Sequence, residues 1–294
     1  MIEEIETFLA SSSLAETTRG LYAYHLERLF HWMEVEQIQP RSLKGDQIRA
    51  YLNGQGWGSS SKNISLCAAR AYWRWKYGSR HQVGQGRIKR QESGPQRTLS
   101  KKQLESLVAS FDTSKPKGIR DLALVMLMLD TGVRATELCR LTMDNLDMDE
   151  QTIQVRVKGG RWEPGAFFEY SRSCLEAWLA IRHTVAMPGV ETVFVAIGGD
   201  TPGQPLTRDG LRANFRKMGI KAGIGRFSPH DLRRSFTTLA LKAGAPTRTV
   251  ELGGRWRDLS MVERYSRALR VKAMHPYSPA NFVMGVKPVN DDED

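Results

Sequence analysis

Apolar residues recur at helical spacing through the first 80 residues of the chain. Between Thr17 and Glu36 they form the series Tyr22, Leu26, Leu29 and Met33. Positions three or four residues apart share one face of an α-helix, so this series predicts a helix with one buried stripe. Residues 1–80 are therefore expected to form a small helical domain.

A second helical pattern runs from about Lys62 to Lys76, after a possible serine cap at residues 59–61. We expect one side to be buried, namely Ile64, Cys67, Ala71 and Trp75. Lys62, Arg70 and Arg74 are basic, and the two arginines share another side. Such a helix is suited to lie along a phosphate backbone. The alternative for this stretch taken alone is a merely soluble helix surface.

The periodicity stops after about residue 80. Residues 81–97 contain glycines and a proline among basic side chains, which is the composition of a linker. We place the domain boundary in this segment. Its cations Arg87, Lys89 and Arg90 are candidate DNA contacts.

The second half begins with a helix start near Thr98–Leu104 and an apolar helix over Ile119–Leu129. The pattern then alternates over Thr152–Val157, which predicts a strand, and a turn and a second strand over Ala166–Tyr170 follow. Helical patterns resume near residue 173 and again from residue 208. The sequence predicts a mainly α fold with a small antiparallel β-sheet, in which residues 98–270 form the larger domain and 271–294 a terminal segment.

Charge points to a polyanionic partner. The chain has 294 residues, with 43 Lys and Arg against 32 Asp and Glu, a net charge of +11. An excess of this size favours binding to nucleic acid through phosphate contacts and counterion release. The basic residues are concentrated between Gly58 and Arg97, whereas residues 291–294 are all acidic.

Cysteine usage and hydropathy narrow the class of protein. Cys67, Cys139 and Cys174 are too few and too widely spaced for a disulfide framework or a paired zinc site. No apolar run approaches the roughly 20 residues of a membrane span, and Met1–Ala10 does not have the pattern of a secretion signal. We expect a cytoplasmic protein, bacterial or archaeal and associated with the nucleoid.

An acidic group near residue 147 invites a metal interpretation. It comprises Asp144, Asp147, Asp149 and Glu150. These residues lack the glycine and the terminal spacing of a calcium loop, so a solvated turn before a strand is the expected structure.

The candidate chemistry lies in a set of cations and a tyrosine. His230 and Arg233 are three residues apart after a helix start at Ser228, so both side chains can approach one anion. Arg134 and Glu137 have the same spacing, and Tyr265 lies 32 residues after Arg233. Each has an ordinary alternative, such as a surface ion pair, the polar face of a helix or a core tyrosine.

The order of these residues is more specific than any one of them. Arg134 in a Thr-Gly-x-Arg-x-x-Glu context, Lys158, His230, Arg233, Trp256 and Tyr265 resemble the signature of the tyrosine recombinase, or phage integrase, family. The family more often has Leu-Gly-His before the tyrosine, where this chain has Gly254-Arg255-Trp256. The resemblance extends over the helical first domain and the linker, to about residue 270.

The resemblance implies a mechanism. Tyr265 would attack a DNA phosphate, and Arg134 and Arg233 would stabilise the charge on its oxygens. Ionising a free phenol at pH 7 opposes about 4 kcal/mol, which nearby cations reduce. His230 could accept the phenol proton or hold the phosphate.

Three further residues complete the implied site. Lys158 is the candidate general acid for the leaving 5′ oxygen, and Glu137 would orient its neighbours. Trp256 would donate a hydrogen bond to a phosphate oxygen, because an indole cannot shuttle a proton. The reaction would need neither metal nor ATP, and we expect no cofactor.

By the same resemblance, the fold is a two-domain clamp on duplex DNA. The enzyme would cleave and rejoin inverted-repeat core sites through a 3′-phosphotyrosine and a Holliday junction. It would act as a homotetramer on two sites, with residues 268–286 docked on a neighbouring protomer and with an accessory protein possible. The expected role is the resolution or integration of a mobile element, plasmid or chromosome dimer. The chain begins at the first helical domain, so no arm-binding domain is expected, which favours resolution. The alternatives are a type IB topoisomerase and a non-catalytic architectural or regulatory DNA-binding protein.

Overall fold

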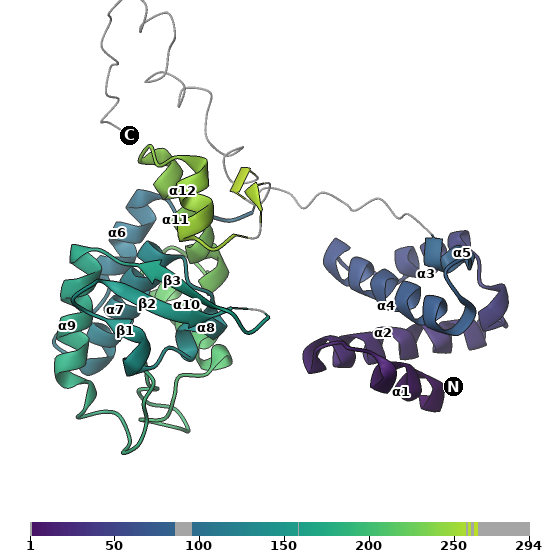
Figure 1. Ribbon diagram of the computed structural model, residues 1–294, viewed down its shortest axis with the longest axis horizontal. Coiled ribbons are helices and arrows are strands. Elements are labelled where there is room, and N and C mark those ends of the chain that lie inside the picture. The colour runs from purple at the N-terminus through teal and green to yellow at the C-terminus, as the bar shows by residue number, and fades with distance from the viewer. Residues whose placement is uncertain (1, 86–95, 158, 257, 260–261, 264–294) are drawn as a thin grey trace, which may run out of the picture. The chain divides into compact units, whose positions relative to one another are not determined.

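The computed structural model describes residues 2–85, 96–157, 159–256, 258–259 and 262–263 (Figure 1). The chain divides into two compact units, Met1–Gly94 and Pro95–Asp294. Both are built mainly from helices, and the described residues of the second also form one small antiparallel sheet. The fold class predicted from the sequence is confirmed. Each unit has its own hydrophobic core.

The first unit is a helical bundle whose core contains several aromatic side chains. Its elements are α1 (Ile2–Ser11), α2 (Glu16–Val35), the 3-10 turn η1 (Pro40–Ser42), α3 (Gly45–Gly54), α4 (Ser59–Tyr77) and α5 (Gln82–Gln85). The predicted α2 stripe is confirmed, since Leu26, Leu29 and Met33 are buried and Tyr22 packs against the core. The ring of Phe30 stacks on that of Trp73 with centroids 5.5 Å apart.

The predicted faces of α4 were wrong. Its buried residues are Ser65, Leu66, Ala68, Ala69, Tyr72 and Trp73, whereas Cys67 and Trp75 are exposed. The aromatic pair decides the rotation of the helix: Tyr72 and Trp73 together bury more apolar area than Cys67 and Ala71 could. The indole of Trp73 also donates a hydrogen bond to the Pro40 carbonyl at 2.9 Å.

The first unit extends past residue 80. Residues 82–85 form α5, and Val83 is buried in the first core. At the other end of the segment expected to be a linker, Arg97 donates to the carbonyls of Ile224 (2.6 Å) and Arg226, which belong to the second unit. Most of the residues between these two anchors lie outside the described part of the chain.

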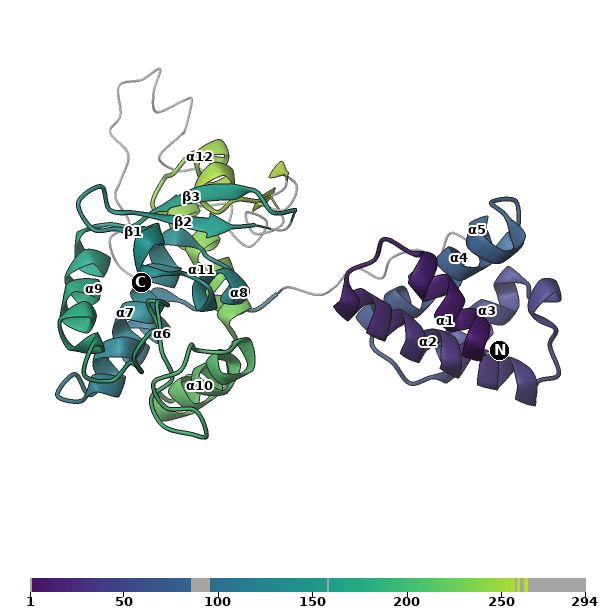
Figure 2. The same cartoon turned by 60° about the horizontal axis from the view of Figure 1, so that its bottom comes forward.

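The second unit surrounds one apolar helix. Its elements are α6 (Lys101–Ala109), α7 (Pro116–Thr131), α8 (Ala135–Cys139), the 3-10 turn η2 (Met143–Asn145), β1 (Leu146–Asp147), β2 (Thr152–Arg156), β3 (Trp162–Ala166), α9 (Glu169–Arg182), α10 (Arg208–Lys221), α11 (Pro229–Lys242) and α12 (Thr247–Gly253). Helix α7 is buried along almost its whole length, as the apolar run predicts, and packs against α9 and α11 (Figure 2).

The sheet has the strand order β1-β2-β3, with β2 and β3 forming an antiparallel hairpin. The expected second strand at Ala166–Tyr170 was wrong, because β3 ends at Ala166 and α9 begins at Glu169. Asp130 explains the change of direction. Its Oδ2 accepts hydrogen bonds from the Phe168 backbone N–H (3.0 Å) and the Ser171 hydroxyl (2.6 Å), which satisfies donors at the start of the helix.

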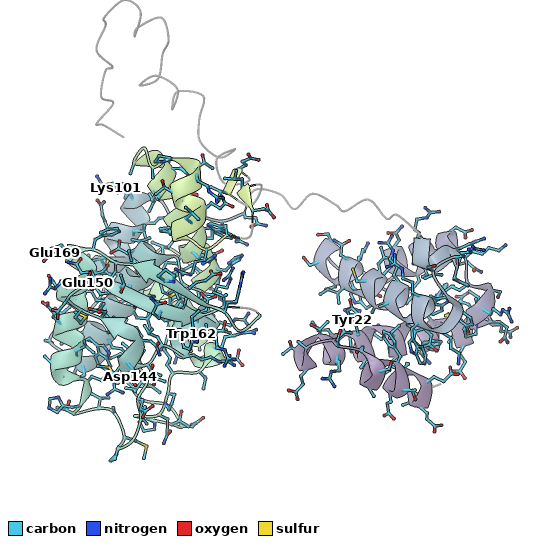
Figure 3. The ribbon with its side chains drawn as sticks, viewed as in Figure 1. Tyr22, Lys101, Asp144, Glu150, Trp162 and Glu169 are labelled. Atoms are coloured by element: carbon cyan, nitrogen blue, oxygen red, sulfur yellow. The ribbon has the colours of Figure 1, made fainter. Side chains whose placement is uncertain are left out.

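The acidic group near residue 147 forms a turn. Asp147 Oδ1 accepts the backbone N–H groups of Asp149 (3.0 Å) and Glu150 (2.8 Å). Figure 3 shows Asp144 and Glu150 at separate places on the second unit. Among the residues that the structure describes, no group of three or more His, Cys, Asp or Glu side chains is arranged to hold a metal ion.

The three cysteines are free thiols. Cys139 and Cys174 are buried, and burial raises the pKa of the Cys139 thiol to about 12, so it stays protonated at neutral pH. No described helix has the length and apolar character needed to cross a membrane.

The hydrogen bonds that cap the start of α11 can be tested by mutation. Ser228 Oγ accepts the Asp231 N–H at 3.3 Å, and the Asp231 carboxylate accepts the Ser228 N–H at 2.9 Å. Ser228→Ala should lower the free energy of unfolding of the second unit by about 1 kcal/mol, measured by urea denaturation. The control is Ser106→Ala in α6, where the exposed hydroxyl bonds only within its own helix. Equal effects of the two changes would contradict the capping role.

Candidate active site

Arg134 is held at the junction between α7 and α8. Helix α7 ends at Gly132, whose φ of 57° is the left-handed conformation that glycine adopts readily. Arg134 then forms the N-cap of α8. Its backbone N–H donates to Glu137 Oε2 at 2.9 Å, and its Nη1 donates to Glu137 Oε1 at 2.6 Å. The Thr-Gly-x-Arg-x-x-Glu spacing therefore places the Glu137 carboxylate where it accepts from both the backbone and the side chain of Arg134.

Glu137 fixes the direction of the Arg134 guanidinium. Its side chain is only 4% exposed, whereas that of Arg134 is 42% exposed. A buried carboxylate requires charged or hydrogen-bonding partners, and here both oxygens have them. Arg134 is thus anchored at one edge and open to solvent at another, which is the arrangement that contact with an anion requires.

Arg233 reaches the same place from α11. It is 1% exposed, and its guanidinium donates to the carbonyl oxygens of Gly132 and Gly254. The indole ring of Trp256 lies against the guanidinium, with Cζ 4.2 Å from the ring centroid. Contact of this kind between a cation and an aromatic face is attractive and is strengthened by burial.

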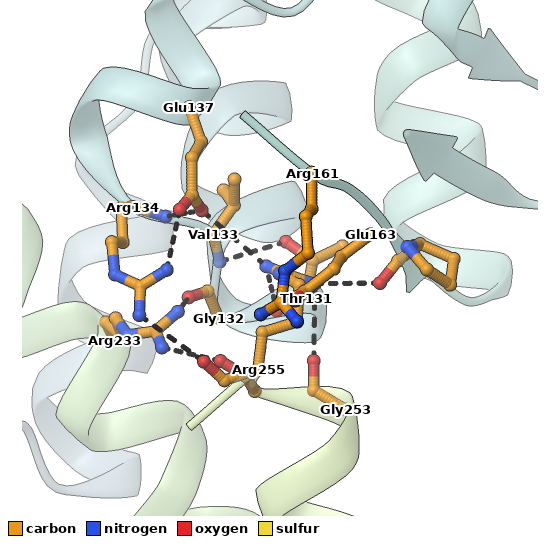
Figure 4. A network of polar contacts seen from close by, with 12 residues as sticks. Thr131, Gly132, Val133, Arg134, Glu137, Arg161, Glu163, Arg233, Gly253 and Arg255 are labelled. Atoms are coloured by element: carbon orange, nitrogen blue, oxygen red, sulfur yellow. Dashed lines mark hydrogen bonds and ion pairs between the residues drawn. The ribbon is translucent and has the colours of Figure 1, made fainter. Parts of the chain in front are cut away.

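The two arginines converge on one short piece of main chain. Arg134 Nη2 donates to the Arg255 carbonyl at 3.3 Å, and Arg233 donates to the adjacent Gly254 carbonyl. Figure 4 shows both guanidinium groups facing this segment. Residues separated by about 100 positions in the sequence are therefore brought together beside residues 254–255.

His230 belongs to the same electrostatic cluster. Partial burial of the ring lowers the pKa of His230, and the positive charges of Arg234, Arg233 and Arg134 lower it further, while Asp231 opposes them. A lowered pKa keeps the imidazole neutral near pH 7, the form that accepts a proton.

Trp256 is held within the second unit. Its indole N–H donates to the Thr237 hydroxyl of α11 at 3.0 Å, and the residue is 7% exposed. The hydrogen bond from this N–H to a phosphate oxygen stays a prediction. In this structure Trp256 packs on Arg233 and joins the segment after α12 to α11.

Lys158 and Tyr265 lie outside the described residues. The turn around position 158 is defined by its neighbours: the Val157 N–H donates to the Arg161 carbonyl at 2.8 Å, and Gly159 and Gly160 have φ values of 100° and 83°. The turn joins β2 to β3, as the sequence predicts.

The candidate DNA contacts on α4 have different surroundings. Lys62 donates to Asn53 Oδ1 at 3.5 Å, and Arg74, which is exposed, donates to the Gly84 carbonyl at 3.2 Å. Arg70 is half-buried, and its Nε and Nη2 have no hydrogen-bond partner among the described residues. The predicted contacts Arg87, Lys89 and Arg90 lie outside the described part of the chain.

Sequence reasoning missed Arg255. This residue is 8% exposed, and its guanidinium donates to main-chain carbonyls of three segments, those of Thr131, Pro164 and Gly253. Its Nη2 also lies 4.0 Å from Glu137 Oε2. The available signal was the arginine at a position where the resembled family more often has glycine.

Comparison with known proteins identifies the family. A family model described as the phage integrase family matches residues 97–270, which is more than half of the chain. The chain belongs to the phage integrase family. The resemblance to tyrosine recombinases drawn from the motifs is confirmed.

Relatives of known name cover nearly the whole chain. Tyrosine recombinase XerD of Vibrio cholerae is 28% identical over 284 residues, which is 92% of this chain and 93% of that protein. Tyrosine recombinase XerC of Bacillus subtilis is 28% identical over 255 residues, or 85% and 77% of the two chains. The similarity to these integrase-family proteins therefore extends beyond the second unit.

Solved structures show the same fold. XerH site-specific recombinase, in a post-cleavage complex with a palindromic difH substrate, aligns with a TM-score of 0.73 and 17% identity over 90% of this chain and 80% of that one. A lambda integrase dimer bound to a COC′ core site aligns with a TM-score of 0.69 and 16% identity over 90% and 93%. At this level of identity the likeness concerns the fold.

Alanine substitution of two adjacent glycines tests the packing of the site. A Cβ on Gly254 would lie 2.6 Å from Trp256 Nε1, whereas one on Gly253 would lie 3.8 Å from its nearest neighbour, Phe236 Cζ. Gly254→Ala should therefore lower the free energy of unfolding by about 1–3 kcal/mol in urea denaturation. Gly253→Ala should change it by less than about 0.5 kcal/mol. Similar values for the two variants would contradict the close contact with Trp256.

The charges around His230 allow a second test. Arg234 pairs with Asp231 at 2.9 Å, so Arg234→Gln removes one cation and also frees one carboxylate. Both changes favour the imidazolium, and the pKa of His230 should rise. An NMR titration of the histidine ring protons measures it, with the His230 signal assigned from its loss in His230→Gln. Arg248→Gln, a change to an exposed arginine in α12, is the control and should leave this pKa unchanged. A fall or no change with Arg234→Gln would contradict the electrostatic account.

Proposed function

We propose that this protein binds duplex DNA at inverted-repeat core sites and cleaves and rejoins its strands by site-specific recombination. The observation that carries the proposal is the convergence of Arg134 and Arg233 on the carbonyls of residues 254–255, which precede Tyr265 in the sequence. His230 lies near enough to both guanidinium groups for their charges to lower its pKa. The relatives named tyrosine recombinase over most of the chain support the proposal, as does the excess of basic residues.

In the proposed reaction, the Tyr265 hydroxyl oxygen attacks the scissile phosphorus and displaces the 5′ oxygen of the next nucleotide. A bond forms between phosphorus and the tyrosine oxygen, and the bond to the leaving oxygen breaks. The phenol proton passes to His230, and Lys158 protonates the leaving oxygen. The reverse attack by a 5′ hydroxyl of another strand reseals the DNA without an external energy source.

The two arginines act on the charge of the phosphate. A phosphodiester repels nucleophiles because it is negatively charged, and that charge grows on its non-bridging oxygens in the transition state. Guanidinium groups match these oxygens in shape and keep their charge. Arg134 carries the more exposed guanidinium, so we assign it the outer phosphate contact and Arg233 the inner one. The anchored Glu137 holds Arg134 in that direction.

The assembly that we propose is a homotetramer on two core sites, with strand exchange through a Holliday junction. The chain surface around α4, including Lys62, Arg70 and Arg74, would contact the DNA backbone together with Arg87, Lys89 and Arg90. The first unit, which includes α5, and residues 98–270 would form the two halves of the clamp, and residues 271–294 would contact a neighbouring protomer. The biological role that we propose is the resolution of a chromosome dimer, a plasmid dimer or a mobile element.

The nucleophile is tested with a nicked suicide substrate, which traps the covalent intermediate. Tyr265→Phe should bind the core site with nearly unchanged affinity and form no covalent protein–DNA adduct, because phenylalanine has no oxygen to attack with. The adduct is detected on a denaturing gel, and binding by gel shift. Tyr170→Phe, which changes an exposed tyrosine at the start of α9, is the matched control and should form the adduct normally. An adduct with Tyr265→Phe would remove this residue from the role.

A further inference from the structure

Arg255 stands where a small residue is more usual. The resembled family more often has Leu-Gly-His where this chain has Gly254-Arg255-Trp256, so Arg255 takes the place of the glycine. Its φ is 51°, in the left-handed region that side chains other than glycine rarely adopt. An arginine kept in that conformation implies that its side chain makes contacts which offset the strain.

Those contacts join three separate segments of main chain. Arg255 Nη2 donates to the Thr131 carbonyl at 3.1 Å, at the end of α7. Its Nη1 donates to the Pro164 carbonyl in β3 at 3.2 Å and to the Gly253 carbonyl at the end of α12 at 3.3 Å (Figure 4). A planar fork of five N–H groups can hold several acceptors at once, whereas a lysine presents a single point of charge.

The surroundings fit the guanidinium closely. A Cβ on Gly165 would lie 2.6 Å from Arg255 Nη1, so the strand has room for this group only because residue 165 is glycine. Glycine inside a strand weakens it and often marks the close approach of another group. The buried Glu137 carboxylate, 4.0 Å away, supplies a counter-charge. Arg255, Gly165 and Glu137 thus form one arrangement.

Arg255 connects strand β3 to residues 253–256, which precede Tyr265 in the sequence. Strand β3 lies at the edge of the sheet and is one arm of the hairpin whose turn contains position 158. Residues 253–256 lead toward Tyr265. We propose that Arg255 is a positioning residue. It fixes the β2–β3 hairpin, and with it Lys158, relative to residues 253–256. This inference rests on the proposed function.

The partners of the side chain indicate this role. Arg255 is buried, and its terminal nitrogens donate to main-chain carbonyls of three segments, one of which is the hairpin strand β3. It therefore acts through the hairpin. Its loss should weaken the step that needs Lys158, protonation of the leaving oxygen, more than the attack itself.

A substrate with sulfur in place of the leaving 5′ oxygen separates these effects, because a thiolate leaves without a proton. Single-turnover cleavage by Arg255→Gly should fall on the order of tenfold or more on the ordinary phosphodiester. On the sulfur-bridged substrate the loss should shrink to about threefold or less, as expected for Lys158→Ala, in which the acid itself is removed. The double variant should be no slower than the slower single variant.

Two further variants keep the test informative if Arg255→Gly is unstable. Gly165→Ala places a methyl group against the guanidinium from β3, and Arg255→Lys keeps the charge but loses the planar fork of donors. For both variants, the loss of cleavage should be smaller on the sulfur-bridged substrate than on the phosphodiester. Arg248→Lys, in the exposed arginine of α12, is the matched control and should cleave both substrates normally. Urea denaturation and gel shift establish that each variant is folded and binds DNA.

The outcomes separate the inference from the function on which it rests. One outcome is that the sulfur-bridged substrate restores cleavage by Lys158→Ala but by none of the Arg255 and Gly165 variants. In that case the positioning role is overturned and the acid assignment stands. If sulfur relieves none of them, Lys158 is not the acid, and the positioning role falls with it. Normal cleavage of the phosphodiester by folded Arg255→Gly would also overturn the inference.

Discussion

The site depends on hydrogen bonds from three guanidinium groups to main-chain carbonyls. Arg233 joins α11 to the end of α7 and to Gly254, and Arg134 joins α8 to the carbonyl of residue 255. Arg255 then links the same segment to β3. An arginine cannot release its proton at physiological pH, so these bonds persist wherever the fold persists. Segments that are distant in the sequence are thereby held around one positively charged place.

Much of this arrangement follows from local rules that can be read in the sequence. Helical spacing of apolar residues predicts α2 and α7, and serine followed three residues later by a side-chain acceptor predicts the starts of α6 and α11. The spacing of Arg134 and Glu137 predicts their pairing. In each case the deciding interaction joins residues within about one helical turn of each other, so the local sequence is enough to predict it.

The features that could not be predicted depend on contacts between distant residues. The rotation of α4 is decided by Tyr72 and Trp73 packing on α2, and the end of β3 is decided by Asp130 of α7. The Trp256 indole N–H is donated to Thr237, a residue 19 positions away. Arg255 gave a signal as an unusual residue, but its partners became evident only from the fold. Periodicity and spacing carry no information on such pairings.

The central claim is that Arg134 and Arg233 neutralise the charge of a scissile phosphate. A methylphosphonate at the cleavage position tests it most directly, because it lacks the negative charge that the arginines are proposed to offset. Single-turnover cleavage of both linkages should be compared for the parent protein, Arg134→Ala and Arg233→Ala. The arginine variants should lose far less activity on the methylphosphonate than on the phosphodiester. Equal loss on the two linkages would contradict it.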